Sequence, residues 1–552
     1  MRHVKYILAP FRFFAWTALL GLCLSVMPDV PAQRAAPRPK IPWQPDQSNG
    51  TYKNPVLFAD YSDPDVIRSG DDFYLIASSF NCVPGLPILH SRDLVNWRIL
   101  GHVFQQQPPA EVFCIPQHGN GVWAPAIRLH NGEFYIFYGD PDFGIYMAKA
   151  QHPAGPWSAP VLVQAAKGWI DPCPFWDDDG KAYLIRAWAR SRSGIQSILT
   201  LHRMSPDGTK LLDEGITVFN GLANHPTIEG PKLYKRNGYY YVFAPAGGVT
   251  RGWQTVLRSK AIYGPYEDRI VMDQGKTQIN GPHQGAWVEL QSGESWFLHF
   301  QDRGAYGRIV HLQPMKWVDD WPVIGADPDG DGKGEPVLGH KKPEVGKNSP
   351  VAVPQTSDEF DTRDLGLQWQ WHANFEPRWF SLSARRGWLR LPAMPMPEGA
   401  VNLWLVPNLL LQKFPAPAFT VTSRLNFTGL ALGEQAGLLI MGTDYSYLAV
   451  ERLGTGFRVR RVVSADAANG GQEVEQASAT LESGVVFLRV RVEPEAVCWF
   501  SFSRDGKEFQ PLGQPFPARP GRWIGAKLGL FAVVRAGGKP SGHADFDWFR
   551  VE

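Results

Sequence analysis

The sequence predicts an all-β protein in which a five-bladed β-propeller precedes a β-sandwich. Five times in the first 300 residues, a polar turn containing a glycine leads into an aromatic, β-rich run. These turns recur about every 50 to 60 residues, enough for the four short strands of a propeller blade. Their glycines are Gly70, Gly132, Gly180, Gly238 and Gly293. Nearer the C-terminal end, apolar and polar residues alternate over 419–425 and 487–492, which indicates a sandwich.

The chain of 552 residues is too long for a single core, and we divide it into five parts. Its start combines basic residues, an apolar stretch and small residues, the pattern of a cleaved secretory signal. The parts are a signal peptide over 1–32, an N-terminal extension over 33–50, the propeller over 51–340, a linker over 341–357 and the sandwich over 358–552. We therefore expect a secreted or periplasmic protein that is free of the membrane once the signal is removed.

Each blade begins with a residue that carries chemistry, shortly before its turn glycine. The first strand of every propeller blade lines the central channel, so these residues are expected to converge on one pocket. Three carboxylates, a histidine and a tryptophan around one hole indicate a site that cleaves sugars. The five residues are Asp63, Trp123, Asp171, Glu229 and His283.

An Asp-Pro pair is also a common turn device, because Asp bonds its own backbone and Pro fixes φ. That alternative applies to Asp63-Pro64 and Asp171-Pro172 taken singly. It does not explain why the acids recur at one point of the repeat. Nor does it explain Glu229, because Glu has no comparable role in turns.

Charge and cysteine content exclude several classes of function. With 55 Lys+Arg against 53 Asp+Glu, nothing favours nucleic acid or an anionic membrane as partner, and a neutral polysaccharide suits the chain better. The cysteines beyond the signal have no CxxC spacing, so neither a zinc site nor a redox motif is indicated. We expect at least two of them to be buried and free, and a disulfide stays open for the rest; they are Cys82, Cys114, Cys173 and Cys498.

One acidic run resembles a calcium loop in its spacing. Residues 327–332 alternate Asp with other residues, but the twelfth-position Glu of an EF-hand is absent and no helix pattern flanks the run. A structural calcium ion and a plain polar hairpin are both open here. No cofactor is required for the chemistry.

Six short motifs are spread over the propeller part of the chain: Asn54-Pro55-Val56-Leu57, Ser62-Asp63-Pro64-Asp65, Trp123-Ala124-Pro125, Ile170-Asp171-Pro172, Ile228-Glu229-Gly230-Pro231 and Gly307-Arg308. In these motifs the chain resembles glycoside hydrolase family 43, over nearly the whole length after the signal. The C-terminal part is similar to the concanavalin-A-like jelly roll that follows the propeller in the β-xylosidases of that family.

The resemblance implies a role for each carboxylate. Asp63 is expected to be the general base that activates water, and Glu229 the general acid that protonates the leaving oxygen. Asp171 is expected to orient Glu229 and to raise its pKa through like charge. The family inverts configuration, which requires the Asp63 and Glu229 carboxyls to stand about 6.5–9.5 Å apart to admit water.

The resemblance also implies a set of residues that bind the sugar. Arg308 neutralises surplus negative charge, and Trp123 offers a flat face to the sugar ring. His283 is expected either to reach a central calcium ion through water or to be an ordinary hydrogen-bonded core histidine. Trp523 is expected to block the pocket beyond one sugar, with plain packing between the domains as the alternative. The whole set is Trp123, Arg308, His283, Phe80 and Trp523.

These roles predict an exo-acting, inverting glycosidase. Its substrates would be neutral, pentose-containing oligo- or polysaccharides of the plant cell wall, such as xylan. It would remove terminal β-D-xylose, α-L-arabinofuranose or both, and the sequence does not rank the two sugars. The alternatives are an endo-acting arabinan hydrolase and a non-catalytic carbohydrate-binding propeller. The fructan-cleaving enzymes are excluded, because Glu229-Gly230 stands where they have Glu-Cys.

Overall fold

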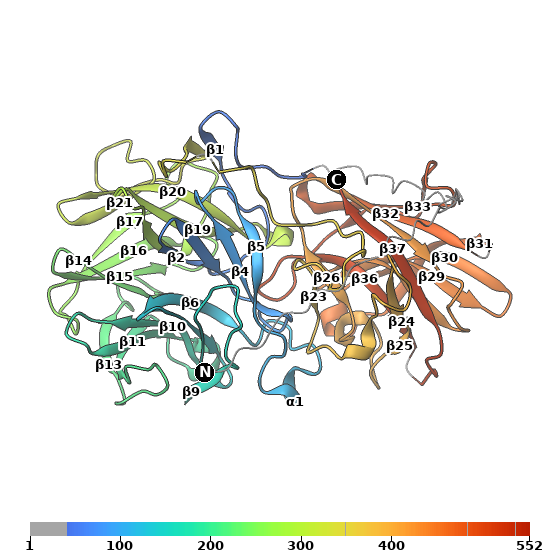
Figure 1. Ribbon diagram of the computed structural model, residues 1–552, viewed down its shortest axis with the longest axis horizontal. Coiled ribbons are helices and arrows are strands. Elements are labelled where there is room, and N and C mark those ends of the chain that lie inside the picture. The colour runs from blue at the N-terminus through green and yellow to red at the C-terminus, as the bar shows by residue number, and fades with distance from the viewer. Residues whose placement is uncertain (1–40, 348, 483, 536) are drawn as a thin grey trace, which may run out of the picture. The chain divides into compact units, whose positions relative to one another are not determined.

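The computed structural model describes residues 41–552 except 348, 483 and 536. The expected signal peptide over 1–32 and the first part of the N-terminal extension lie outside the described residues. Strands dominate the described part (Figure 1), whose two α-helices, α1 (Ala110–Phe113) and α2 (Arg190–Ser193), have four residues each. No helix described here is long and apolar enough to cross a membrane.

The N-terminal half forms five antiparallel sheets of four strands, each built from consecutive strands. These sheets are the five predicted blades. Blades 1 and 2 comprise β2 (Asp65–Ser69), β3 (Asp72–Ile76), β4 (Gly85–Ser91), β5 (Arg98–Phe104), β6 (Trp123–His130), β7 (Glu133–Asp140), β8 (Gly144–Ala150) and β9 (Val161–Ala165). Blades 3 and 4 comprise β10 (Trp169–Trp176), β11 (Ala182–Trp188), β12 (Ile198–Met204), β13 (Ile216–Asn220), β14 (Lys232–Arg236), β15 (Tyr239–Ala246), β16 (Trp253–Ser259) and β17 (Glu267–Met272). Blade 5 comprises β18 (His283–Glu289), β19 (Ser295–Asp302), β20 (Arg308–Val318) and β21 (Trp321–Ile324).

The five turn glycines join the first strand of each blade to the second, as the repeat predicts. Their φ angles lie between +62° and +86°, in the left-handed region that costs a residue with a Cβ atom. A Cβ atom would meet nothing within 4 Å at any of the five positions. The backbone conformation of the turn, and not crowding, is therefore the reason for glycine.

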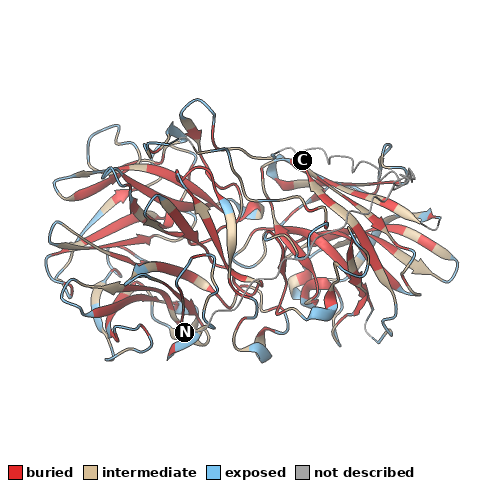
Figure 2. Cartoon of the chain, in the orientation of Figure 1, coloured by how far each residue is buried: buried red, intermediate tan, exposed pale blue. Residues whose placement is uncertain are grey.

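Most residues of the blade strands are buried (Figure 2), and the ring closes between blade 5 and blade 1. At that closure β18 contacts β2, and a single apolar cluster contains Val66 and Trp97 of blade 1 together with Ala286 and Leu298 of blade 5. The first strands of neighbouring blades contact each other at four of the five junctions, β2 with β6, β6 with β10, β10 with β14 and β18 with β2, which brings the starts of these strands close together.

The segment that precedes blade 1 also closes the ring, by pairing with the last blade. Leu57 and Val310 exchange backbone hydrogen bonds of 3.2 and 3.0 Å. The Asn54 side chain donates to the carbonyls of Leu312 and Val337 and accepts the N–H of Leu312, each at 2.8 Å. A two-stranded sheet of β1 (Thr51–Lys53) and β22 (Gly339–Lys341) continues this pairing. The two ends of the propeller chain are thereby fastened to each other.

The C-terminal half is a sandwich of two sheets, coloured orange to red in Figure 1. One sheet comprises β23 (Gln370–Trp371), β25 (Met394–Pro395), β26 (Leu410–Lys413), β28 (Glu434–Met441), β29 (Tyr445–Leu453), β30 (Gly456–Ser464), β31 (Glu473–Leu481) and β36 (Lys527–Val534). The other comprises β24 (Leu389–Pro392), β27 (Phe419–Asn426), β32 (Val485–Glu493), β33 (Val497–Ser503), β34 (Gln510–Pro511), β35 (Phe516–Pro517) and β37 (His543–Val551). Short 3₁₀ helices include η1 (Gly304–Tyr306), η2 (Pro377–Trp379), η3 (Leu403–Leu405), η4 (Ala467–Asn469) and η5 (Pro494–Ala496).

The two sheets of the sandwich differ in what covers them. Strand β27 alternates strictly between buried and half-buried residues, as its sequence predicts, so one face of its sheet meets solvent. Strands β28 and β36 are buried along their whole length. Residues from 396 to 409, among them Trp404, pack against their second face. No cysteine of the described residues forms a disulfide: Cys82, Cys173 and Cys498 are buried, and Cys114 is exposed.

We predict that Asn54→Ala lowers stability by about 2–3 kcal/mol, because it removes two buried hydrogen bonds and one partly buried one, worth about 1 kcal/mol each. The loss should appear as a lower midpoint of thermal unfolding. The control is Asn49→Ala, an exposed asparagine whose side chain only accepts from Thr51 nearby. Equal unfolding midpoints for the two variants would contradict this account of ring closure.

Candidate active site

A pocket of about 430 Å³ opens where the first strands of the five blades begin. The residues that begin the five blades were predicted from the sequence to converge at this point. All five line it, and so do the three residues that the resemblance added. The eight are Asp63, Phe80, Trp123, Asp171, Glu229, His283, Arg308 and Trp523.

Unusual backbone conformations turn two of the carboxylates into the pocket. Asp63 and Asp171 have φ angles of +55° and +56°, a region that is unfavourable for residues with a Cβ atom and is concentrated at functional sites. Beside Glu229, Gly230 has φ of +58°, and a Cβ atom there would lie 2.7 Å from the Gln284 side chain. The backbone conformations of Asp63 and Asp171 therefore direct their side chains into the pocket, and glycine at position 230 leaves room for the Gln284 side chain.

Asp63 is buried and held by two donors. The Ser78 hydroxyl donates to Oδ2 at 2.6 Å, and the Arg308 guanidinium contacts Oδ1 at 2.9 Å. Only 4% of Asp63 is exposed. Each oxygen therefore acts as an acceptor, and the salt bridge to Arg308 suits a charged carboxylate. Such a group can take a proton from water.

The other two carboxyls have raised pKa values. Burial is the main cause for Glu229, followed by the charges of Asp171 and Asp63, and its pKa rises to about 8. Burial and the charge of Asp63 raise the pKa of Asp171 to about 7. Asp171 differs in accepting the backbone N–H of Gly230 at 2.8 Å, which favours its charged form. The arrangement therefore leaves the proton on Glu229, which keeps 29% of its side chain exposed to the pocket.

His283 lies beside Glu229 as an uncharged ring. Its Nε2 atom is 3.5 Å from Oε1 of Glu229, and the side chain is fully buried. Burial and the nearby charge of Arg308 lower its pKa to about 3. Within the described part of the chain, neither of its ring nitrogens has a hydrogen-bond partner. The water-mediated link from His283 to calcium stays a prediction.

Aromatic rings form the outer wall of the pocket. Trp123 and Trp523 meet edge to face with centroids 6.3 Å apart, although Trp523 comes from the sandwich. The guanidinium of Arg308 lies 5.7 Å from the Trp523 ring, and that of Arg192 lies 5.5 Å from the Trp123 ring. Trp523 is 54% exposed, so much of this large side chain remains available to a ligand.

Sequence reasoning missed several residues that hold this site. Ser78, which donates to Asp63, and Asp60, which accepts the backbone N–H of Arg308, belong to no motif, and the fold brings their partners to them. Gln284 could have been predicted from the sequence, because it follows His283 at the start of the fifth blade. Its side-chain amide lies 3.4 Å from Asp171. Trp188 also lines the pocket, at the end of β11.

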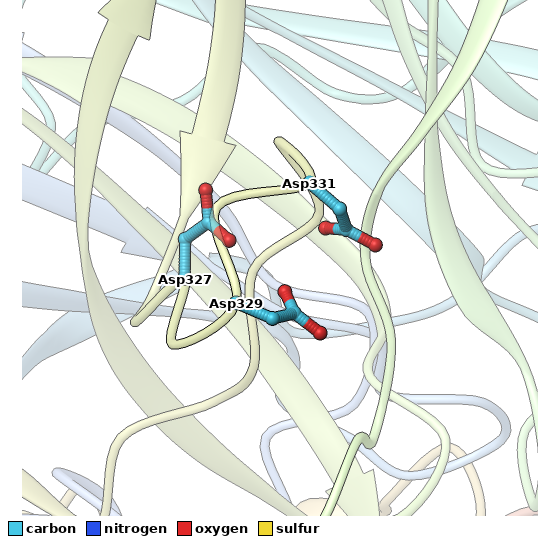
Figure 3. Close-up of side chains that lie close together, drawn as sticks. All are labelled: Asp327, Asp329 and Asp331. Carbon is cyan, nitrogen blue, oxygen red and sulfur yellow. The ribbon is translucent and has the colours of Figure 1, made fainter.

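The acidic run is not among the residues that line the pocket. Figure 3 shows its three aspartates close together in one loop. Asp327, Asp329 and Asp331 bring one carboxylate oxygen each within 4.8 Å of one another, and oxygen is the ligand that calcium prefers. Asp327 also accepts the backbone N–H groups of Gly330 and Gly332, as in a polar turn. Both expectations for this loop are compatible with these contacts, and the calcium ion stays a prediction.

Comparison with known proteins identifies the family. The profile of Glycosyl hydrolases family 43 matches residues 52–322, and that of the Beta xylosidase C-terminal Concanavalin A-like domain matches 357–552. A protein of Xylanibacter ruminicola is 42% identical over 88% of this chain and 87% of its own length. The chain belongs to glycosyl hydrolase family 43. This family 43 chain is therefore a glycosidase, as its sequence predicts.

Named relatives cover almost the same length. A Beta-xylosidase of Formosa agariphila is 33% identical over 92% of this chain and 91% of its own. A Non-reducing end alpha-L-arabinofuranosidase of Bacteroides ovatus is 28% identical over 90% of this chain and 94% of its own. The crystal structure of a xylan beta-1,4-xylosidase from Bacillus halodurans is similar with a TM-score of 0.80 and 28% identity, over 91% of this chain and 99% of that one.

We predict that Asp171→Asn moves the alkaline limb of the pH profile of kcat/KM to lower pH. An acid catalyst works while protonated, and the Asp171 charge raises the pKa of Glu229. Removing that charge lets Glu229 lose its proton at lower pH. The control is Asp142→Asn, whose carboxylate pairs with Arg192 at 3.2 Å and should leave the limb in place. An alkaline limb unmoved in Asp171→Asn would refute this coupling.

Proposed function

We propose that this family 43 enzyme is an exo-acting, inverting glycosidase that removes terminal β-D-xylose, α-L-arabinofuranose or both. One observation carries the proposal. A carboxylate paired with Arg308 and a carboxyl of raised pKa share one pocket, so a base and an acid are both present at neutral pH. The names of the relatives point to the two pentoses.

In this mechanism Glu229 gives its proton to the glycosidic oxygen as the bond to the anomeric carbon breaks. Asp63 takes a proton from a water molecule, whose oxygen attacks the same carbon from the opposite face. The aglycone leaves with the Glu229 proton, and the sugar leaves with inverted configuration. Arg308 holds the Asp63 carboxylate through their salt bridge, and Asp171 keeps Glu229 protonated until the bond breaks.

The pocket favours exo action over its alternatives. An endo-acting arabinan hydrolase needs an open groove that admits a chain on both sides, whereas Trp523 stands at the wall of this pocket beside Trp123. A non-catalytic sugar-binding propeller would not need all three carboxylates or a raised pKa on one of them. The proposed substrate is therefore the non-reducing end of a neutral, pentose-containing oligosaccharide or polysaccharide.

Export is part of the proposal and depends on residues 1–32. Their basic start and apolar stretch are those of a secretory signal, which would place the enzyme in the periplasm or outside the cell. That location would bring it to plant-wall fragments. The chemistry uses only side chains of this chain, and calcium, if it binds, would have a structural role.

We predict hydrolysis of aryl β-D-xyloside, aryl α-L-arabinofuranoside or both, assayed side by side. Early products followed by proton NMR should have the inverted anomeric configuration. Retention of configuration would refute the roles given to Asp63 and Glu229. Inactivity on both aryl substrates and on unsubstituted oligomers of both sugars would refute the proposed activity.

We predict that Asp63→Asn and Glu229→Gln each lower kcat by about 10²–10⁴-fold, because each removes general acid–base assistance. An aryl substrate with a good leaving group should partly rescue Glu229→Gln alone, since only the task of the acid becomes easier. The control is Glu133→Gln, whose carboxylate contacts Lys149 on β8 and should retain full activity. Equal rescue of both active-site variants would show that the two roles are reversed or shared.

A further inference from the structure

Asp60 is a buried carboxylate that holds two distant parts of the chain. Its Oδ1 atom accepts the backbone N–H of Arg308 at 2.9 Å, and its Oδ2 atom accepts the backbone N–H of Gly525, also at 2.9 Å. Only 3% of the residue is exposed. Arg308 begins the third strand of blade 5, whereas Gly525 belongs to a loop of the sandwich. One side chain therefore joins three segments.

In the propeller, the segment that contains Asp60 and Asp63 holds both the backbone and the side chain of Arg308. Asp60 takes the Arg308 N–H, and the N–H of Tyr61 donates to the Arg308 carbonyl at 3.1 Å. The guanidinium then reaches back to Asp63 at 2.9 Å. Backbone and side chain of Arg308 are thus both positioned by residues 60–63. A shift of its backbone would be passed to the salt bridge with Asp63.

On the sandwich side, Gly525 is two residues beyond Trp523. The next N–H, that of Ala526, donates to the Ala305 carbonyl in η1 at 2.7 Å, so adjacent residues of the loop are held by Asp60 and by blade 5. Trp523 has a φ of +63°, which is unfavourable for a large side chain. An unfavourable conformation persists only where the surrounding structure holds it, and the bond that Gly525 donates to Asp60 lies two residues away.

The three segments lie so close together that there is no room for a Cβ atom at Gly307 or Gly525. A Cβ atom on Gly525 would lie 2.7 Å from the Gly307 nitrogen, and one on Gly307 would lie 2.5 Å from Cγ of Asp60. Glycine at both positions lets the backbones approach until the Asp60 carboxylate reaches both N–H groups. The junction leaves little space for the loop to move while Asp60 is in place.

We propose that Asp60 is a positioning residue that sets Arg308 against Asp63 and holds Trp523 at the wall of the pocket. Asp60 therefore holds both the sandwich loop that carries Trp523 and the arginine that pairs with the base, Asp63. The effect on catalysis rests on the function proposed for this pocket, whereas the effect on the loop does not. Asp60 itself is absent from the pocket lining and acts only through these two residues.

The test is Asp60→Asn. An amide offers one acceptor oxygen and one NH₂ donor, so it can accept only one of the two N–H groups and turns a donor toward the other. We expect kcat/KM on an aryl pentoside to fall about 10-fold or more, since hydrogen bonds to charged groups are among the stronger ones. We also expect trypsin to cleave after Arg522, an exposed residue of this loop, at least several-fold faster.

The matched control is Asp358→Asn in the sandwich. Asp358 is 6% exposed and likewise accepts two backbone N–H groups, those of Phe360 and Gly366. Its loss should lower the unfolding midpoint while leaving both kcat/KM and cleavage after Arg522 unchanged. If Asp60→Asn does not fold, Asp60→Ser, with a smaller side chain that keeps one acceptor, takes its place with the same readouts.

Two results would overturn the proposal. One is an Asp60 variant with wild-type kcat/KM and a wild-type rate of cleavage after Arg522. The other is an Asp358→Asn variant that changes both readouts as much as Asp60→Asn does, because the effect would then follow from lost stability alone. If the wild-type enzyme cleaves no pentoside, the proposed function fails, and the trypsin readout still decides whether Asp60 holds the loop.

Discussion

Three carboxylates share one pocket, and the close approach of these like charges governs the site. Arg308 neutralises one of them, Asp63, at 2.9 Å. The remaining negative charge cannot all be kept in so small a volume of low polarity, so a proton stays on Glu229. The propeller imposes this crowding by delivering one acid from each of three blades. Asp63 and Glu229 are both carboxyl groups, and their different surroundings in the pocket make one a base and the other an acid.

Much of this arrangement could be predicted from the sequence because it is encoded locally. A turn that needs a positive φ selects glycine, and five such turns revealed the five blades. The acids stand at a fixed place before those turns, so their convergence followed from the geometry of a propeller. The alternation in β27 and β32 likewise reports on burial at those very residues.

What escaped prediction depends on contacts between residues far apart in the chain. Ser78 and Asp60 look like any other polar residue until the fold brings Asp63, Arg308 and Gly525 to them. The burial of β28 on both faces depends on the segment from 396 to 409, which carries no periodic pattern. The order of strands in the sandwich is similarly a matter of pairing over long distances, which local propensity does not contain.

The closure of the ring by Asn54 bears on how the protein is made. Its partners Leu312 and Val337 are 258 and 283 residues further along the chain. During synthesis the first blade therefore leaves the ribosome long before the residues that complete the ring have been made. Until then, the backbone groups of the segment around Leu57 lack their partners in blade 5. Pairing over such separations is slow and leaves strand edges exposed in the meantime. Cotranslational folding of this propeller can proceed blade by blade, but its last step must join the beginning of the domain to its end.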